Sequence, residues 1–412
     1  MRATIAPPAK FRPRATFVVA LLALGIWVAC FRFPMVWIAT GIGEPGTPFL
    51  DLYGLLASSD AAQAGANPFQ PNALDPYHRP FLYSEWWLAA GKVGLTRADT
   101  GWIGWLWVGT TLVTALAMCR PRTLRENIWM FLWFVSPAML MAINRANPDL
   151  LMYVMVSAGL VALRSARWPW RALGMVLLAA AAVLKYFPGV ALIVLLDART
   201  RRELFGALMV YGLVLVLAWL PLEAGLASAA RFKPVSTWLY AFGAPVIFRD
   251  FGVENSTGWL ALTAIVGVAA VWWAWRSMPS ADESEASRVD AREFAVGAAM
   301  VVACFFLGAS YAYKLVFSAW LLPVLWRGEH DWADERWRRA TGWLLAGTLA
   351  FEGVMAVVLN VVVTPLSRPL AEGLLTASLV VAQLFGWGLV LCLLRFLLVY
   401  AGLRLRSARF AR

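Results

Sequence analysis

Charged residues are scarce in this chain. Asp, Glu, Lys and Arg make up only 15% of its 412 residues, while 61% of the residues are apolar. Soluble domains carry about 25% charged residues, and a water-facing surface could not accommodate so many apolar ones. The composition therefore excludes a soluble globular protein and predicts a polytopic membrane protein. The 23 Trp and 23 Phe residues fit a chain with many membrane–water interfaces.

Cysteine and histidine are rare as well. The four cysteines fall in or beside apolar runs, and no pair shares a predicted outer loop, so we expect no disulfide framework. The sequence has no Walker loop, Gly-rich strand–helix turn, H-E-x-x-H motif or nucleophile elbow. An activity driven by nucleotide hydrolysis is therefore disfavoured. The net charge of +12 is spread over short loops rather than massed on one face, so we expect no nucleic-acid partner.

Apolar runs that could cross roughly 30 Å of hydrocarbon predict an all-α polytopic membrane protein with about twelve transmembrane helices. We treat residues 1–412 as a single integral membrane domain. The predicted spans are 15–40, 101–119, 126–143, 149–164, 171–184, 186–197, 204–222, 256–276, 293–309, 311–327, 341–362 and 374–400.

The distribution of Lys and Arg predicts the orientation. With the N-terminus inside, 25 of the 36 basic residues lie in inner segments, as the positive-inside rule expects. Both termini are then cytoplasmic. Two long outer segments follow, 41–100 and 223–255, and we expect juxtamembrane surface helices at 51–65, 81–92 and 236–248.

Polar side chains that hydrophobic packing does not require recur at the outward turns of this topology. They are Asp51, Arg145, Asn147, Asp149, Lys185, Tyr186, Tyr311, Tyr313 and Lys314. Ionisable groups in membrane spans usually mark pathways or sites, so these residues are predicted to share one outward cavity. Simpler interpretations stay open: Asp51 as a helix cap, the two lysines as headgroup anchors, and Asn147-Pro148-Asp149 as a turn.

A carboxylate beside several cations suits transfer of a group from a lipid-linked phosphate to an acceptor hydroxyl. The carboxylate would take the acceptor's proton and the cations would stabilise the departing phosphate. We predict Asp51 as this base and Arg145, Lys185 and Lys314 as the phosphate-binding cations. Asp60, Asp75, Glu85 and Asp149 are the alternative bases. No cofactor besides the lipid-linked donor substrate is expected. Metal dependence stays open, with absence favoured because no second outer carboxylate stands beside Asp51 in an Asp-x-Asp arrangement.

Four motifs in order give the chain a family resemblance. They are Asp51-Leu-Tyr53 followed by Ala61 and Gly65-Ala-Asn67-Pro68-Phe69, then Arg145-Ala-Asn147-Pro-Asp149-Leu150, Leu184-Lys185-Tyr186-Phe187-Pro188 and Tyr311-Ala-Tyr313-Lys314-Leu315. Together they resemble the polyprenol-phosphate-sugar-dependent membrane glycosyltransferases of the GT-C class, in particular the group with the mycobacterial mannosyltransferase of phosphatidylinositol mannoside synthesis. The departures are Ala146 in place of Gly, Lys314 in place of Arg, and Tyr83-Ser84-Glu85 in place of a Tyr-Pro-Pro or Tyr-Pro-Arg segment.

The resemblance implies an all-helical fold in a bacterial inner membrane with its active site at the outer leaflet, Asp51 as general base, and inversion at the anomeric carbon. The donor would be a polyprenyl-phosphate sugar and the acceptor a glycolipid or glycan of the cell envelope. Further substrate-binding residues are then expected among the motif positions and their neighbours: Tyr53, Glu85, Asn147, Asp149, Tyr186, Tyr311 and Tyr313.

Two other functions remain open. A transporter or flippase of a lipid-linked or small anionic substrate also places polar residues in spans, although transporters often show two matching halves with broken helices near the midplane. A structural subunit of an envelope assembly would make the outward polar set accidental. The asymmetry of the two long outer loops favours the enzyme.

Overall fold

The computed structural model describes residues 13–33, 37, 47–198, 200–231, 241–246, 256–277, 285–307, 310–327, 335–358 and 368–410. Helices dominate these residues. The elements are α1 (Pro13–Arg32), α3 (Leu50–Gln63), η1 (Glu85–Leu88), α4 (Ala89–Lys92), η2 (Arg97–Asp99), α5 (Thr100–Cys119), α6 (Leu124–Phe134), α7 (Pro137–Arg145), α8 (Asp149–Leu163), α9 (Trp168–Lys185), η3 (Phe187–Asp197), α10 (Arg201–Arg231), β1 (Ala241–Phe242), α12 (Ser256–Arg276), α13 (Glu285–Phe306), β2 (Ser310–Tyr311), η4 (Ala312–Leu321), α14 (Leu322–Arg327), α15 (Glu335–Val358) and α16 (Arg368–Phe410).

The all-α prediction is confirmed, but twelve membrane spans are not. Helical structure coincides with each predicted apolar run, yet four helices of the described chain are long and apolar enough to cross a membrane. The number rises to five if the bent pair α6 and α7 counts as one span. Several runs are short or form 3₁₀ helices, and residues 359–362 of the eleventh predicted span lie outside the described residues.

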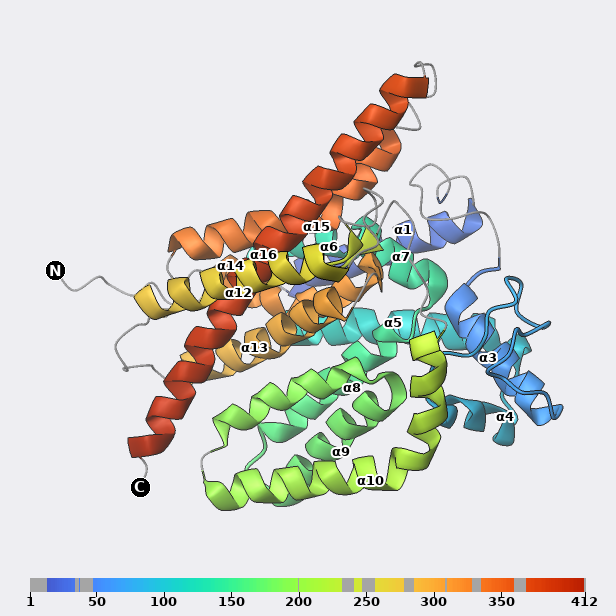
Figure 1. The fold of residues 1–412 in the computed structure, drawn as a ribbon, viewed down its shortest axis with the longest axis horizontal. Helices are drawn as coiled ribbons and strands as arrows, with labels where there is room; N and C mark the ends of the chain where they lie inside the picture. The colour runs from blue at the N-terminus through green and yellow to red at the C-terminus, as the bar shows by residue number, and fades with distance from the viewer. Residues whose placement is uncertain are drawn as a thin grey trace.

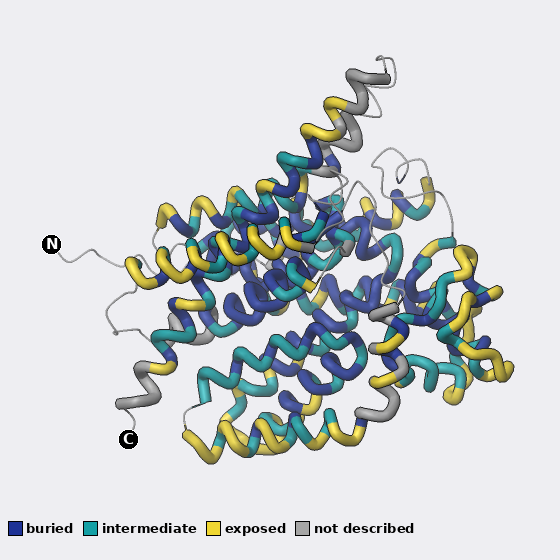
Figure 2. Tube along the Cα trace, viewed as in Figure 1, coloured by how far each residue is buried: buried dark blue, intermediate teal, exposed yellow. Residues whose placement is uncertain are grey.

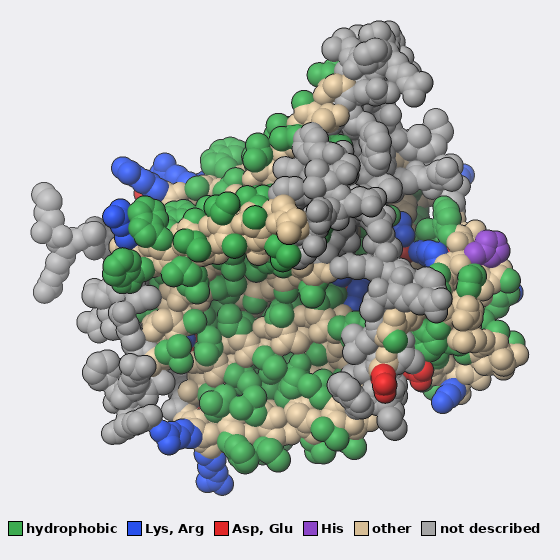
Figure 3. All heavy atoms as spheres, in the orientation of Figure 1, with side chains coloured by type: hydrophobic (Ala, Val, Ile, Leu, Met, Phe, Trp, Pro, Cys, Tyr) green, Lys and Arg blue, Asp and Glu red, His purple; other side chains and the backbone are tan. Residues whose placement is uncertain are grey.

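Apolar side chains on the outside of the helices support the membrane character. Figure 2 shows exposed residues along α10 and α12, and these include Leu213, Val216 and Leu217 on α10 and Val268 and Trp275 on α12. On the face drawn in Figure 3, hydrophobic side chains cover the broad middle, and Lys and Arg side chains lie at the left and lower-left edges and again on the right, near Asp, Glu and His. Large contiguous apolar faces of this kind are rare on soluble monomers and suit contact with lipid.

The helices form packed groups around a continuous core (Figure 1). α8 packs on α9 and α9 on α10, so these three lie side by side, while α16 crosses the molecule and packs on α12, α13 and α15. β1 pairs antiparallel with β2, with Ala241 opposite Tyr311 and Phe242 opposite Ser310. The pairing fixes the chain just before η4, which carries Tyr313 and Lys314.

The outer surface helices were predicted with mixed success. The helix expected at 51–65 is present as α3, whereas the one expected at 81–92 is shorter and consists of η1 and α4. Of the helix expected at 236–248, residues 241–242 instead form the strand β1, whereas Val246 is helical; 236–240 and 247–248 lie outside the described residues. The first residues of the predicted outer segment 223–255 are helical, since α10 continues to Arg231.

A bend between α6 and α7 sets up the polar end of α7. The two helices meet at 51° across Val135 and Ser136. Ser136 caps α7 by accepting a hydrogen bond from the Met139 backbone N–H, and Pro137 occupies the first turn, where a missing N–H costs nothing. α7 then ends at Arg145, and Ala146 turns the chain with a left-handed φ of 40°. The first turn of α8 with Asp149 follows directly.

Candidate functional site

Asp51 is buried, with 7% of its surface exposed, in the first turn of α3. The N-cap of this helix is Phe49, whose φ of 58° is left-handed, and no side chain caps the helix. The interpretation of Asp51 as a simple cap is therefore wrong. The Phe49 backbone N–H donates to the Asn144 carbonyl at 2.8 Å, which ties the start of α3 to the end of α7.

Three side chains hold the Asp51 carboxylate. Arg145 binds it through two hydrogen bonds of 2.9 Å, from Nε to Oδ2 and from Nη2 to Oδ1. Arg79 Nη1 donates to Oδ1 at 3.0 Å, and Asn147 Nδ2 donates to Oδ2 at 2.6 Å. Such bidentate, charge-assisted contacts fix both the position and the charge of a carboxylate.

These contacts decide the protonation state of Asp51. Burial alone would raise its pKa, but the charge and hydrogen bonds of Arg145, the charge of Arg79 and the hydrogen bond from Asn147 together hold the pKa well below its usual range. Asp51 is therefore ionised at neutral pH. While both guanidinium groups remain in place, it is also a weak base.

A second charged cluster lies next to the first. Asp149 has no exposed surface, and its carboxylate oxygens lie 2.8 Å from Lys185 Nζ and 3.4 Å from Lys314 Nζ. Asn147 joins the two clusters, because its amide nitrogen donates to Asp51 and its Oδ1 accepts a hydrogen bond from Lys185 Nζ at 2.7 Å. The predicted residues Arg145, Asn147, Asp149, Lys185 and Lys314 thus converge around Asp51.

Aromatic rings cover the cations of both clusters. The Arg145 guanidinium carbon lies 5.4 Å from the ring centre of Tyr311, and Lys185 Nζ lies 5.9 Å from that of Tyr313. The ring of Tyr83 is 5.4 Å from Lys185 Nζ. Burial raises the pKa of the Tyr83 phenol, with a further increase from the negative charge of Asp51, so this group is neutral at physiological pH. Cation–π contacts hold the cations without neutralising them.

Three predicted site residues lie elsewhere. Tyr53 lines an open cavity of about 590 Å³ together with Asp75, His78 and Arg97. Tyr186, with a φ of 60°, turns its hydroxyl toward Gly225 of α10. Glu85 begins η1, and among the described residues it makes no hydrogen bond or ion pair with the clusters. Tyr53 follows Asp51 by two residues on α3, so the two side chains point to different sides of the helix. Glu85 lies in the segment between α3 and α5, and the turn at Tyr186 redirects its ring.

Sequence reasoning missed Arg79 and assigned Asp75 only as an alternative base. Arg79 contacts both Asp51 and Asp75, with its Nη2 2.8 Å from Asp75 Oδ2. Gly54 on α3 allows this pair to approach, because a Cβ there would lie 2.5 Å from Asp75 Oδ2. The available signal was an arginine in the same outer segment as Asp51, where the positive-inside rule makes cations uncommon.

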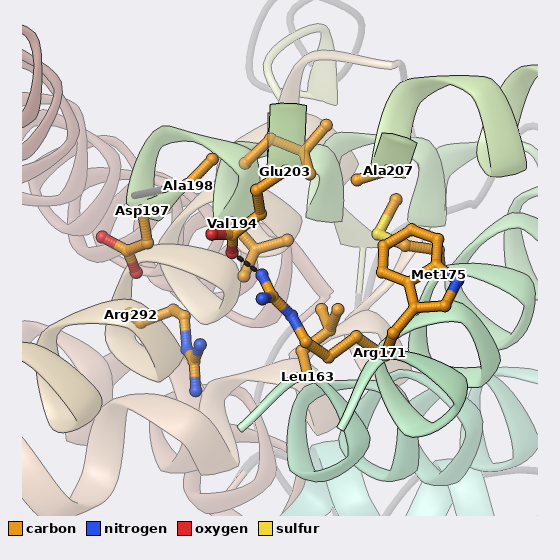
Figure 4. Close-up of a pocket in the computed structure, with 11 residues that line it drawn as sticks. Leu163, Arg171, Met175, Val194, Asp197, Ala198, Glu203, Ala207 and Arg292 are labelled. Atoms are coloured by element: carbon orange, nitrogen blue, oxygen red, sulfur yellow. Dashed lines mark ion pairs between the residues drawn. The ribbon is translucent and has the colours of Figure 1, made fainter. Parts of the chain in front are cut away.

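A separate charged group joins helix ends far along the chain from Asp51. Arg171 of α9 pairs with Glu203 of α10, as Figure 4 shows, while Asp197 of η3 lies 2.7 Å from Arg404 of α16. Arg171, Asp197 and Glu203 line a cavity of only about 40 Å³. We interpret this group as ion pairing between segments that the sequence places inside.

Comparisons with known proteins leave the family open. No known family model, curated protein or solved structure matches the chain. Among the residues that the structure describes, no three His, Cys, Asp or Glu side chains are grouped as metal ligands.

Proposed function

We propose that this chain is an inverting hexosyl- or pentosyltransferase. It would move a sugar from a polyprenyl-phosphate donor to a hydroxyl of a lipid or glycan acceptor at the outer face of the membrane. The observation that carries the proposal is one buried network in which Asp51 is held by Arg79, Arg145 and Asn147 beside the cluster of Asp149, Lys185 and Lys314.

The charge of this network suits the donor. Its four cations, Arg79, Arg145, Lys185 and Lys314, and its three carboxylates, Asp51, Asp75 and Asp149, leave one net positive charge. The donor's phosphodiester carries one negative charge. Binding of one donor phosphate would neutralise the network, which favours an anionic lipid head over a neutral one.

The residues support a direct displacement. The acceptor oxygen attacks the anomeric carbon as the bond between that carbon and the phosphate oxygen breaks, and the sugar configuration inverts. The acceptor proton goes to the Asp51 carboxylate, and the electron pair of the broken bond stays with the polyprenyl phosphate. Arg145, Lys185 and Lys314 stabilise the charge that develops on the leaving phosphate.

Donor binding would also activate the base. In the structure Arg145 supplies two of the hydrogen bonds to Asp51. A phosphate oxygen that draws Arg145 away would remove the strongest influence lowering the Asp51 pKa, so the carboxylate becomes a better base only when a donor is present. The acceptor would approach from the open cavity lined by Tyr53, Asp75 and His78, since Arg79 links Asp75 to Asp51.

The decisive experiment compares two aspartates of α3. Membranes containing the parent protein should consume members of a panel of radiolabelled polyprenyl-phosphate hexoses and pentoses. Asp51→Asn should lower the transfer rate by a factor on the order of 10² to 10⁴ at equal protein abundance, as expected when a general base is removed. Asp60→Asn is the matched control, because Asp60 lies on the same helix as Asp51 but pairs with Arg97 of η2 and not with the network.

The transporter alternative rests on the same buried chain of charges. Alternating carboxylates and cations that link α3, α7, α8, α9 and η4 could also line a substrate pathway. A parent protein that moves the labelled lipid across vesicles without consuming it would support that function. For the enzyme proposal, an Asp51→Asn variant that transfers sugar at a rate within a few-fold of the parent would contradict the role of Asp51 as the base.

A further inference from the structure

A groove of about 650 Å³ opens between α6, α7, α14 and α15, and it is separate from the charged network. Its floor on α15 is made of small residues, Gly342, Ala346 and Ala350, which follow one another at intervals of four and so share one helix face. A Cβ at Gly342 would meet nothing within 4 Å, so the groove is open at this point. Volumes of this size accommodate a drug-sized ligand or a hydrocarbon chain.

The walls of the groove are apolar and accessible from the side. Trp129 of α6 and Trp343 of α15 face each other with ring centres 6.4 Å apart, and Leu325 and Trp326 of α14 also line the groove. Trp343 is 71% exposed and Leu132 of α6 49% exposed. In a membrane these surfaces would meet lipid chains.

One end of the groove is basic. Arg125 of α6 and Arg338 and Arg339 of α15 line it together with Glu335, which leaves two net positive charges. Glu335 pairs with both arginines of α15, and the Arg339 side chain remains 68% exposed. The sequence assigns all three arginines to inner segments, so this end is predicted to lie at the cytoplasmic leaflet.

The other end of the groove is closed by close packing. A Cβ at Gly353 would lie 2.0 Å from Cγ of Pro137, so α15 and α7 touch there. The helical rise of about 1.5 Å per residue puts roughly 21 Å between Arg339 and Gly353. One leaflet of hydrocarbon is roughly 15 Å thick, so an acyl chain that starts at the arginines fits within the groove.

We propose that this groove binds an anionic phospholipid of the inner leaflet, with one acyl chain along the small residues of α15 and the phosphate at Arg125, Arg338 and Arg339. Two net positive charges favour an anionic headgroup over a zwitterionic one. Basic pockets between membrane helices on the cytoplasmic side bind such headgroups in the same way.

Native mass spectrometry of the purified full chain, titrated separately with phosphatidylglycerol and phosphatidylcholine, tests the proposal. The parent should retain phosphatidylglycerol preferentially. The double change Arg125→Gln with Arg339→Gln should weaken its binding about tenfold, because charge-assisted hydrogen bonds to the phosphate are lost. Gly342→Phe should weaken the binding of both lipids, because the phenyl ring fills the groove.

Two control variants separate this site from general lipid contact. Arg276→Gln removes an exposed arginine at the end of α12, and Gly267→Phe adds a ring on the same helix where a Cβ would meet nothing within 4 Å. Neither should alter phosphatidylglycerol retention. The proposal is overturned if the parent shows no preference, if the groove variants bind like these controls, or if undecaprenyl phosphate binds more tightly than phosphatidylglycerol with the same dependence on Gly342.

Discussion

At the scale of single residues, the network explains why Asp51 stays charged although it is buried. Its pKa in the folded protein is depressed, so the ionised carboxylate contributes to stability above the ordinary titration range of an aspartate. That contribution is lost as the pH falls through the depressed pKa. Removal of a cation should therefore raise the Asp51 pKa. The pH below which Asp51 loses both its stabilising charge and its ability to accept a proton then rises.

A variant of Arg145 should show this shift directly. In Arg145→Gln the Asp51 pKa should rise, since the guanidinium charge that offset the effect of burial is gone. The acid limb of the residual kcat/KM should therefore move to higher pH in a profile that begins near the lowest pH at which the protein stays folded. Arg276→Gln is the control, because Arg276 is exposed at the end of α12, where its guanidinium lies over the ring of Trp272 and outside the network. Superimposable profiles for Arg145→Gln and the parent would contradict the assigned role of Arg145.

At the scale of elements, the end of α7 places three site residues in succession. Arg145 is its last residue, Ala146 adopts the left-handed φ of 40° and Asn147 follows, so one turn directs Arg145 and Asn147 to the same carboxylate. Glycine adopts a positive φ without steric cost, so the backbone at Ala146 has the conformation that favours Gly.

Two alanines of this region test the turn. Ala146→Gly relieves about 1–2 kcal/mol of left-handed strain and costs about 0.5–1 kcal/mol in chain entropy and about 0.8 kcal/mol for the buried methyl. The free energy of unfolding should therefore change by less than about 1 kcal/mol. Ala142 lies inside α7 and is equally buried, but it has no left-handed strain to relieve. Ala142→Gly should therefore lower the free energy of unfolding by about 1–2 kcal/mol. Thermal unfolding in detergent compares them, and equal losses would argue against strain at Ala146.

The positions of the helices could be predicted from the sequence better than their type. Apolar runs located α5, α8, α9 and α12 to within a few residues, because hydrophobicity marks any segment shielded from water. The same signal could not distinguish 3₁₀ from α geometry in η3 and η4, and it gave no sign of β1. Motif positions identified most of the charged network, but the Arg79 contact depends on how residues 64–84 fold, which no periodicity encodes.

At the scale of the whole molecule, a broad apolar body separates two charged regions. The network around Asp51 gathers the residues that the sequence places outside, whereas the ion pairs of Arg171 and Asp197 and the basic end of the α15 groove belong to segments it places inside. A glycosyltransferase with an outer active site requires this orientation, since its donor phosphate and acceptor must meet at the outer leaflet.

Cysteine labelling tests the orientation. Ala73 is exposed on the rim of the open cavity, and Ala166 is exposed in the turn between α8 and α9, on the side predicted to be cytoplasmic. All four native cysteines are buried, so a new thiol can be introduced into the natural sequence with little background. After permeabilisation of the outer membrane, an impermeant thiol reagent should modify Ala73→Cys in intact cells and Ala166→Cys only after lysis. The reverse pattern would place Asp51 and its cations on the cytoplasmic side, and an outer-leaflet sugar transfer would then be physically impossible for this protein.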